Sequence, residues 1–130
     1  MAEVVNGALL DTSILIAIQV DVDQLPPSAA ISVVTLGELH AAVHLARTDR
    51  IRRLRQDRLD AIRSAFAPLP VDEPVAERYG ELLALARRRR RTAKATDLLI
   101  IATAAASSRT LYTYDTAQKR LALAAHVAVA

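Results

Sequence analysis

The sequence of 130 residues contains no cysteine and no tryptophan, and Phe66 is its single phenylalanine. Without cysteine, the chain can have no disulfide, no thiolate zinc site and no cysteine nucleophile. Aromatic residues make up only 3% of the chain and hydrophobic residues 52%, so the core must be built from alanine, leucine, isoleucine and valine. No uncharged run reaches the roughly 18 residues that a membrane-spanning helix requires, and the N-terminus lacks the basic region of a signal peptide. We therefore expect a single domain over residues 1–130, without a membrane span and in the cytoplasm, although the sequence leaves secretion open.

Positive charge is concentrated in two stretches of the chain. The net charge is +3, but seven arginines fall within residues 47–63 and five more form the run 87–91, which Lys94 follows. A basic surface favours an anionic partner, most often nucleic acid, whereas solvated helix faces explain either cluster taken alone. Because aromatic residues are few, recognition of a nucleic acid would depend on backbone charge and shape more than on base stacking.

Short apolar segments alternate with helical patterns along the chain. The predicted strands are residues 7–10, 30–33, 68–71, 110–113 and 126–129, and the predicted helices are residues 34–47, 50–66, 75–90 and 97–107. Such alternation predicts an α/β fold with a mostly parallel central sheet of four to five short strands, flanked by helices on both faces. In sheets of this kind, ligands bind at the carboxyl ends of the strands.

Four carboxylates occupy positions where acids are unexpected. Asp11 directly follows the first predicted strand, and Asp115 lies just after the strand 110–113. Glu38 and Asp97 have apolar residues at the i+3 and i+4 positions, which share a helix face with them. Carboxylates gathered at one sheet edge would repel one another unless a cation neutralised them, and oxygen ligands of this kind suit Mg²⁺ or Mn²⁺.

Three of these acids have a plainer explanation when each is taken alone. Asp11 is equally consistent with the cap of a helix that begins at Thr12, and Asp97 with a place at the start of a helix. Taken alone, Asp115 is better explained as an ordinary turn residue. Glu38 lies inside a predicted helix, where no cap explains it. A shared site accounts for all four acids more simply than four coincidences.

The three histidines do not supply a convincing general base. His40 and His44 have the i, i+4 spacing that can bind zinc, but Glu38 lies about 200° around the helix from His40. His126 belongs to the last predicted strand and is better explained as structural. Metal-activated water therefore remains the favoured nucleophile.

The sequence resembles the PIN-domain ribonucleases and, within them, the VapC-type toxins of bacterial toxin–antitoxin systems. The stretches that carry the resemblance are LLDTS (9–13), VVTLGELHAAV (33–43), ATDLLIIATAA (95–105) and LYTYD (111–115). It implies a single PIN-like domain and a metal-dependent endoribonuclease whose catalytic and metal-binding acids are Asp11, Glu38, Asp97 and Asp115. It also implies products with 3′-hydroxyl and 5′-phosphate ends.

Supporting residues and partners follow from the same resemblance. Ser13 would support the metal site, and Thr113 would support Asp115. The residues expected to contact RNA or the antitoxin are Arg87, Arg88, Arg89, Arg90, Arg91 and Lys94. The resemblance implies a VapB-type antitoxin that blocks the acidic site, and a homodimer. At the last motif the chain departs from many relatives, which carry an asparagine followed by an Asp-Phe pair, because here Asp115 is followed by Thr116, Ala117, Gln118 and Lys119.

Two other functions remain open at this point. A receiver-type signalling module also binds Mg²⁺ with acids at strand ends, and Asp72 would then accept the phosphoryl group. Its usual pair of early acids is a single acid here, and Glu38 and Asp97 would have no role. A degenerate PIN domain that binds RNA or a partner without cutting is the other alternative, against which the four intact acids argue.

Overall fold

Four short parallel strands form the central sheet of the molecule. The computed structural model describes residues 7–17, 25–26 and 28–130. The strands are β1 (Ala8–Leu10), β2 (Ala29–Ser32), β3 (Pro68–Leu69) and β4 (Thr110–Tyr112). Their order in the sheet is β3-β2-β1-β4, and every neighbouring pair is parallel. The predicted α/β fold with a parallel sheet is confirmed, and β1 lies at its centre.

The predicted strand over residues 126–129 is wrong. In that segment the structure contains only an isolated parallel bridge between Leu111 and Val129. A helix extends to Ala124, and the chain then turns at His126, whose φ of 61° is left-handed. Two hydrogen bonds form this bridge, from the N–H of Leu111 to the carbonyl of Ala128 and from the N–H of Ala130 to the carbonyl of Leu111.

Six helices cover the sheet in the described residues. They are α1 (Thr12–Ala17), α2 (Val33–His44), α3 (Asp49–Ala65), α4 (Glu73–Arg88), α5 (Ala95–Ala106) and α6 (Thr116–Ala124). The four predicted helices correspond to α2, α3, α4 and α5 within a few residues at each end. Helix α6 was missed, and α1 was considered only as an explanation for Asp11. Both are short and directly follow a strand and an aspartate. Within the described ranges, no helix is both long and apolar enough to cross a membrane.

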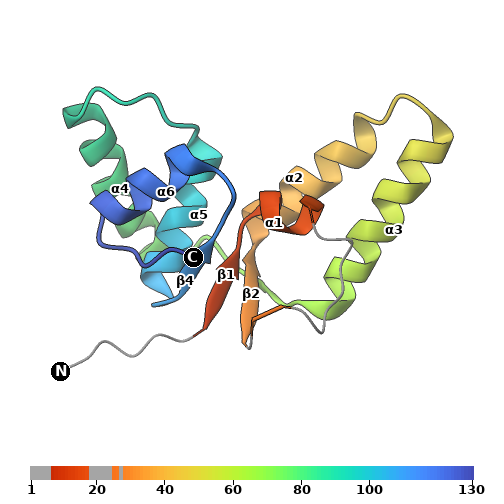
Figure 1. Ribbon diagram of the computed structural model, residues 1–130, viewed down its shortest axis with the longest axis horizontal. Coiled ribbons are helices and arrows are strands. Elements are labelled where there is room, and N and C mark those ends of the chain that lie inside the picture. Colours follow the sequence, from red (N-terminus) through yellow and green to blue (C-terminus); the bar gives the residue numbers. More distant parts are fainter. Residues whose placement is uncertain (1–6, 18–24, 27) are drawn as a thin grey trace.

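The two faces of the sheet contribute to separate cores. Leu9 packs with α4, α5 and α6 residues, whereas Ala8 and Leu10 pack with residues of α1, α2 and α3. This alternation follows from the two-residue period of a strand. Figure 1 shows the consequence, with α2 and α3 on one side of the strands and α4, α5 and α6 on the other. Helices α1 and α6 begin at the carboxyl ends of β1 and β4, so this end of the sheet receives their first turns.

The end of α4 gives a prediction about stability. Arg90 has a φ of 52° just after the helix, and the N–H of Arg91 donates to the carbonyl of Ala86 at 2.9 Å. A side chain disfavours this left-handed conformation, which glycine adopts freely. We expect Arg90→Gly to raise the free energy of unfolding by about 1 kcal/mol, measured by thermal or urea unfolding. Arg87→Gly is the matched control, because it removes the same charge from the last helical turn and should lower stability by about 0.5–1 kcal/mol. Equal destabilisation by both variants would contradict the prediction.

Candidate active site

Asp11 is a buried carboxylate at the junction of β1 and α1, and its side chain is 6% exposed. Its Oδ2 accepts three hydrogen bonds, from the N–H of Ser13 at 3.2 Å, the hydroxyl of Ser13 at 2.8 Å and the hydroxyl of Thr113 at 3.0 Å. No described residue donates to Oδ1. The cap and the ligand explanations are therefore compatible, because one oxygen is held by the protein and the other is left for a further ligand.

Backbone groups orient the two hydroxyls that hold Asp11. The N–H of Tyr114 donates to the Ser13 hydroxyl, and the N–H of Asp115 donates to the Thr113 hydroxyl, both at 3.0 Å. Each hydroxyl oxygen thus accepts from the β4–α6 connection and directs its proton to Asp11. Thr113 was expected to support Asp115, and it touches the backbone of Asp115 while donating to Asp11.

Glu38 is half-buried on α2 and points to the start of α1. The Thr12 hydroxyl donates to its Oε1 at 2.9 Å, and among the described residues Oε2 has no donor. Sequence reasoning did not assign this role to Thr12. The only available signal was a hydroxyl directly next to Asp11, which did not indicate a contact 26 residues away.

Asp115 is an exposed residue that caps α6. Its Oδ1 accepts from the N–H groups of Ala117 at 2.9 Å and Gln118 at 3.1 Å. The turn explanation is thus replaced by a helix cap. In the described part of the chain, Oδ2 has no donor and stays available.

Asp97 lies in the first turn of α5, where its carboxyl is half-buried. Burial raises the pKa of this carboxyl, and the negative charges of Asp115, Asp11 and Glu38 raise the pKa further, while Lys94 lowers it. All three of the other candidate acids therefore act on Asp97. The structure brings the four acids, which come from four different segments, to the same end of the sheet.

This donor set suits a divalent cation in its chemistry. The four side chains supply only carboxylate oxygens. Asp11, Glu38 and Asp115 each use one oxygen within the protein, and no donor to the other oxygen lies among the described residues. Hard cations such as Mg²⁺ prefer such ligands. As the side chains stand, no group of three or more acidic, histidine or cysteine residues in the described ranges is close enough to hold one ion. Binding would therefore require carboxylates to rotate inward, which would cost Glu38 its bond to Thr12 and would weaken the cap that Asp115 makes on α6.

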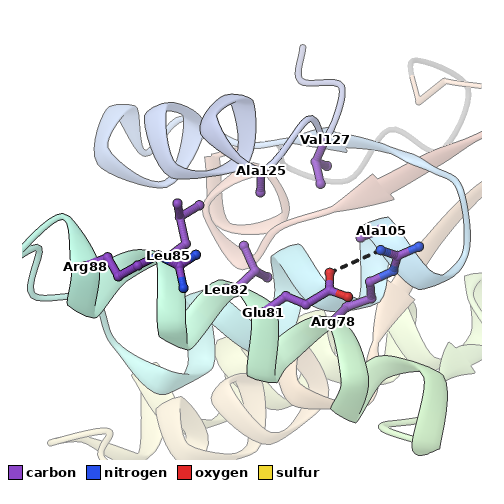
Figure 2. Close-up of a pocket in the computed structure, with 8 residues that line it drawn as sticks. All are labelled: Arg78, Glu81, Leu82, Leu85, Arg88, Ala105, Ala125 and Val127. Carbon is purple, nitrogen blue, oxygen red and sulfur yellow. Dashed lines mark hydrogen bonds and ion pairs between the residues drawn. The ribbon is translucent and has the colours of Figure 1, made fainter.

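Two residues of the arginine run line different hollows of the surface. Arg91 and Lys94 line a cavity of about 490 Å³ together with Asp97 and Asp115. Arg88 instead lines a smaller groove of about 200 Å³, in which Leu82 and Leu85 of α4 lie opposite the C-terminal segment (Figure 2). None of the four acids lines this groove. Arg87, Arg89 and Arg90 are exposed and line neither of the two hollows.

The histidines lie apart from the acids, as expected. His40 and His44 are exposed on α2, and His126 is exposed after α6. Asp72, the acceptor in the receiver alternative, caps α4 by accepting from the N–H of Val75 at 3.2 Å.

Comparisons with known proteins agree with this geometry. The family model described as PIN domain matches residues 8–123. Ribonuclease VapC8 of Mycobacterium tuberculosis is 39% identical over 104 residues, which cover 77% of this chain and 92% of that protein. The solved structure of VapBC-5, a member of the VapBC family of toxin–antitoxin systems from Mycobacterium tuberculosis, is 33% identical with a TM-score of 0.83, covering 95% of this chain and 97% of that one. FitAcB from Neisseria gonorrhoeae is 32% identical with a TM-score of 0.76, covering 94% and 95% of the two chains. The chain belongs to the PIN-domain family.

Proposed function

We propose that this protein is a metal-dependent endoribonuclease and the toxin of a toxin–antitoxin pair. The observation that carries the proposal is the convergence of Asp11, Glu38, Asp97 and Asp115, which is expressed in the raised pKa of Asp97. Its similarity to Ribonuclease VapC8 supports RNA as the substrate. With the histidines elsewhere, the carboxylates are the groups at this edge of the sheet that fit hydrolysis of a phosphodiester.

The four acids would hold Mg²⁺ or Mn²⁺, which when bound supplies an activated water and neutralises charge on the phosphate. Asp11 is the fixed member of the set, because Ser13 and Thr113 hold one of its oxygens. Glu38 and Asp115 are held less firmly, because Glu38 accepts one hydrogen bond from Thr12 and Asp115 is exposed. The hydrolysis then leaves a 3′-hydroxyl and a 5′-phosphate.

Removal of divalent cations is expected to stop cleavage. Purified protein incubated with total RNA should degrade it in Mn²⁺ or Mg²⁺, and EDTA should lower the rate by about 100-fold or more because the carboxylates alone have no electrophile. Excess Mn²⁺ should restore the rate. Asp72→Asn, which removes one charge but keeps a capping side chain on α4, should cut as the wild type does. Cleavage that persists in EDTA would overturn the metal mechanism.

The partners and the location belong to the same proposal. A VapB-type antitoxin is supported by the similarity to VapBC-5, which was solved as a toxin–antitoxin system. Its C-terminal segment would block the acidic site. We also propose a homodimer, which sedimentation of the isolated chain tests, and action in the cytoplasm, where the RNA substrate is found.

A further inference from the structure

The cavity beside Asp97 and Asp115 is larger than those two acids require. It has a volume of about 490 Å³ and lies between the loop that precedes α5, the first turn of α5 and the first turns of α6. This volume falls within the range of about 300–1,000 Å³ typical of small-ligand sites. Besides the two acids, the lining contains cations, one buried amide, one threonine and apolar side chains.

Three cations line the cavity, and they come from two segments. Arg91 and Lys94 precede α5, and Arg120 lies on α6. Sequence reasoning named the first two residues but not Arg120. Lys94 is also the N-cap residue of α5 and makes no side-chain capping bond, so within the described part of the chain no side chain accepts from the N–H groups of the first turn of α5. Uncapped helix N-termini and adjacent cations together favour a phosphate group.

Gln118 is the buried amide of this cavity. It is 3% exposed, and its carbonyl Oε1 is shielded from solvent and has no hydrogen-bond donor among the described residues. Its Nε2 donates to the main-chain carbonyl of Asp97 at 3.5 Å, a long and therefore weak bond that leaves the amide free to turn toward the cavity that Gln118 lines. A buried carbonyl without a donor costs about 1–3 kcal/mol, and a ligand that donates a hydrogen bond to the turned amide would recover this cost. The side chain of Gln118 thus connects α6 to the first turn of α5, and its carbonyl oxygen is left without a donor among the described residues.

We propose that this cavity is a nucleotide subsite, which holds one nucleotide of the RNA strand beside the bond that is cut. Arg91, Lys94 and Arg120 bind its phosphate, and the carbonyl of Gln118 accepts a hydrogen bond from the nucleotide. The donor is an exocyclic amino group of the base or the ribose 2′-hydroxyl. The assignment rests on the proposed ribonuclease function, and it adds Gln118 and Arg120 as residues that determine substrate position and selectivity.

The subsite is tested by measuring the binding of single strands under conditions in which the protein does not cleave them. The anisotropy of labelled single strands is measured in EDTA with the full chain, using oligocytidine, oligouridine and oligodeoxycytidine. Arg120→Gln should weaken binding of all strands by about 3–10-fold and reduce the slope of log affinity against log salt by about 0.7, the value for one phosphate contact on a single strand. Arg63→Gln removes the same charge from the end of α3, on the opposite side of the sheet (Figure 1), and should leave the slope unchanged.

Gln118→Met keeps the length of the side chain and removes the acceptor. If a base amino group is the donor, the wild type prefers oligocytidine over oligouridine by about fivefold or more, and the variant loses this preference. If the 2′-hydroxyl is the donor, the variant instead loses a preference for RNA over DNA. If Gln118 has only a structural role, Gln118→Met should weaken the binding of all strands equally. This result would overturn the assignment of Gln118 to the subsite.

The results separate the subsite from the proposed function. A wild type that binds and cuts RNA, with Arg120→Gln behaving like Arg63→Gln, would overturn the subsite alone. A wild type that neither binds RNA in EDTA nor cuts it in Mn²⁺ would overturn both.

Discussion

Asp97→Asn is expected to abolish RNA cleavage and at the same time to raise the melting temperature of the metal-free protein. The carboxyl of Asp97 has a raised pKa because of its burial and of the charges of Asp115, Asp11 and Glu38. At neutral pH the ionised group is therefore less favourable in the folded than in the unfolded protein. Asparagine removes this repulsion but also removes a ligand, so we expect a loss of at least about 100-fold in the cleavage rate.

The stability gain depends on pH with a definite sign. Because the folded protein binds the Asp97 proton more tightly than the unfolded chain, this group lowers stability as pH rises from the ordinary value of 3.8 through the raised pKa. The melting-temperature advantage of Asp97→Asn, measured by calorimetry in EDTA, should thus be full at neutral pH and shrink toward 3.8. Asp72→Asn, at an acid that caps α4, should show no such advantage. Equal melting temperatures for wild type and Asp97→Asn at neutral pH would contradict the prediction.

The loss of either hydroxyl that donates to Asp11 should lower both the stability and the activity of the protein. Hydrogen bonds to a buried charge each contribute about 1.5–3 kcal/mol, so Ser13→Ala and Thr113→Val should each lower the free energy of unfolding by about 2 kcal/mol. Because these hydroxyls fix the rigid member of the site, each variant should also lower the cleavage rate by about 10–100-fold. Urea unfolding and the cleavage rate in Mn²⁺ measure the two effects.

A double-mutant cycle shows whether the hydroxyls act through Asp11. In an Asp11→Asn background, Thr113→Val should cost clearly less stability than in the wild type, because the charge that the hydroxyl serves is gone. Ser64→Ala is the control, since the Ser64 hydroxyl bonds the carbonyl of Asp60 on exposed α3 and should change stability little. The same cost of Thr113→Val in both backgrounds would show that its hydroxyl acts independently of the carboxylate.

The sequence predicted the sheet and the acidic edge because both follow from local patterns. Apolar runs separated by helical periods indicate parallel strands, and Glu38 stood out because no cap explained it. Hydrogen bonds between side chains that lie far apart in the sequence could not be predicted from local patterns. Thr12 and Glu38 meet only after α1 packs against α2, and the role of Gln118 depends on how α6 lies against α5.

The errors have equally local causes. Residues 126–129 form a short apolar segment as the strands do, but the turn at His126 brings them to β4 at one position only. Helix α6 begins at Asp115, for which sequence reasoning weighed a metal-binding role against a turn and did not consider a helix cap. The receiver alternative placed a phosphoryl acceptor at Asp72, and membership in the PIN-domain family overturns it.

The central place of β1 in the sheet determines when the active site can form during synthesis. Of the described strands β1 is made first, yet its partner β4 and the hydroxyl that holds Asp11 come much later, with Thr113 separated from Asp11 by 102 residues. A nascent chain must therefore carry Asp11 without the strand that buries it until β4 has been made. Asp97 and Asp115 also follow β1, β2 and β3 in the sequence, so the site is completed only once Asp115 has been made. A nuclease with this topology cannot attack the messenger from which it is being translated before that point.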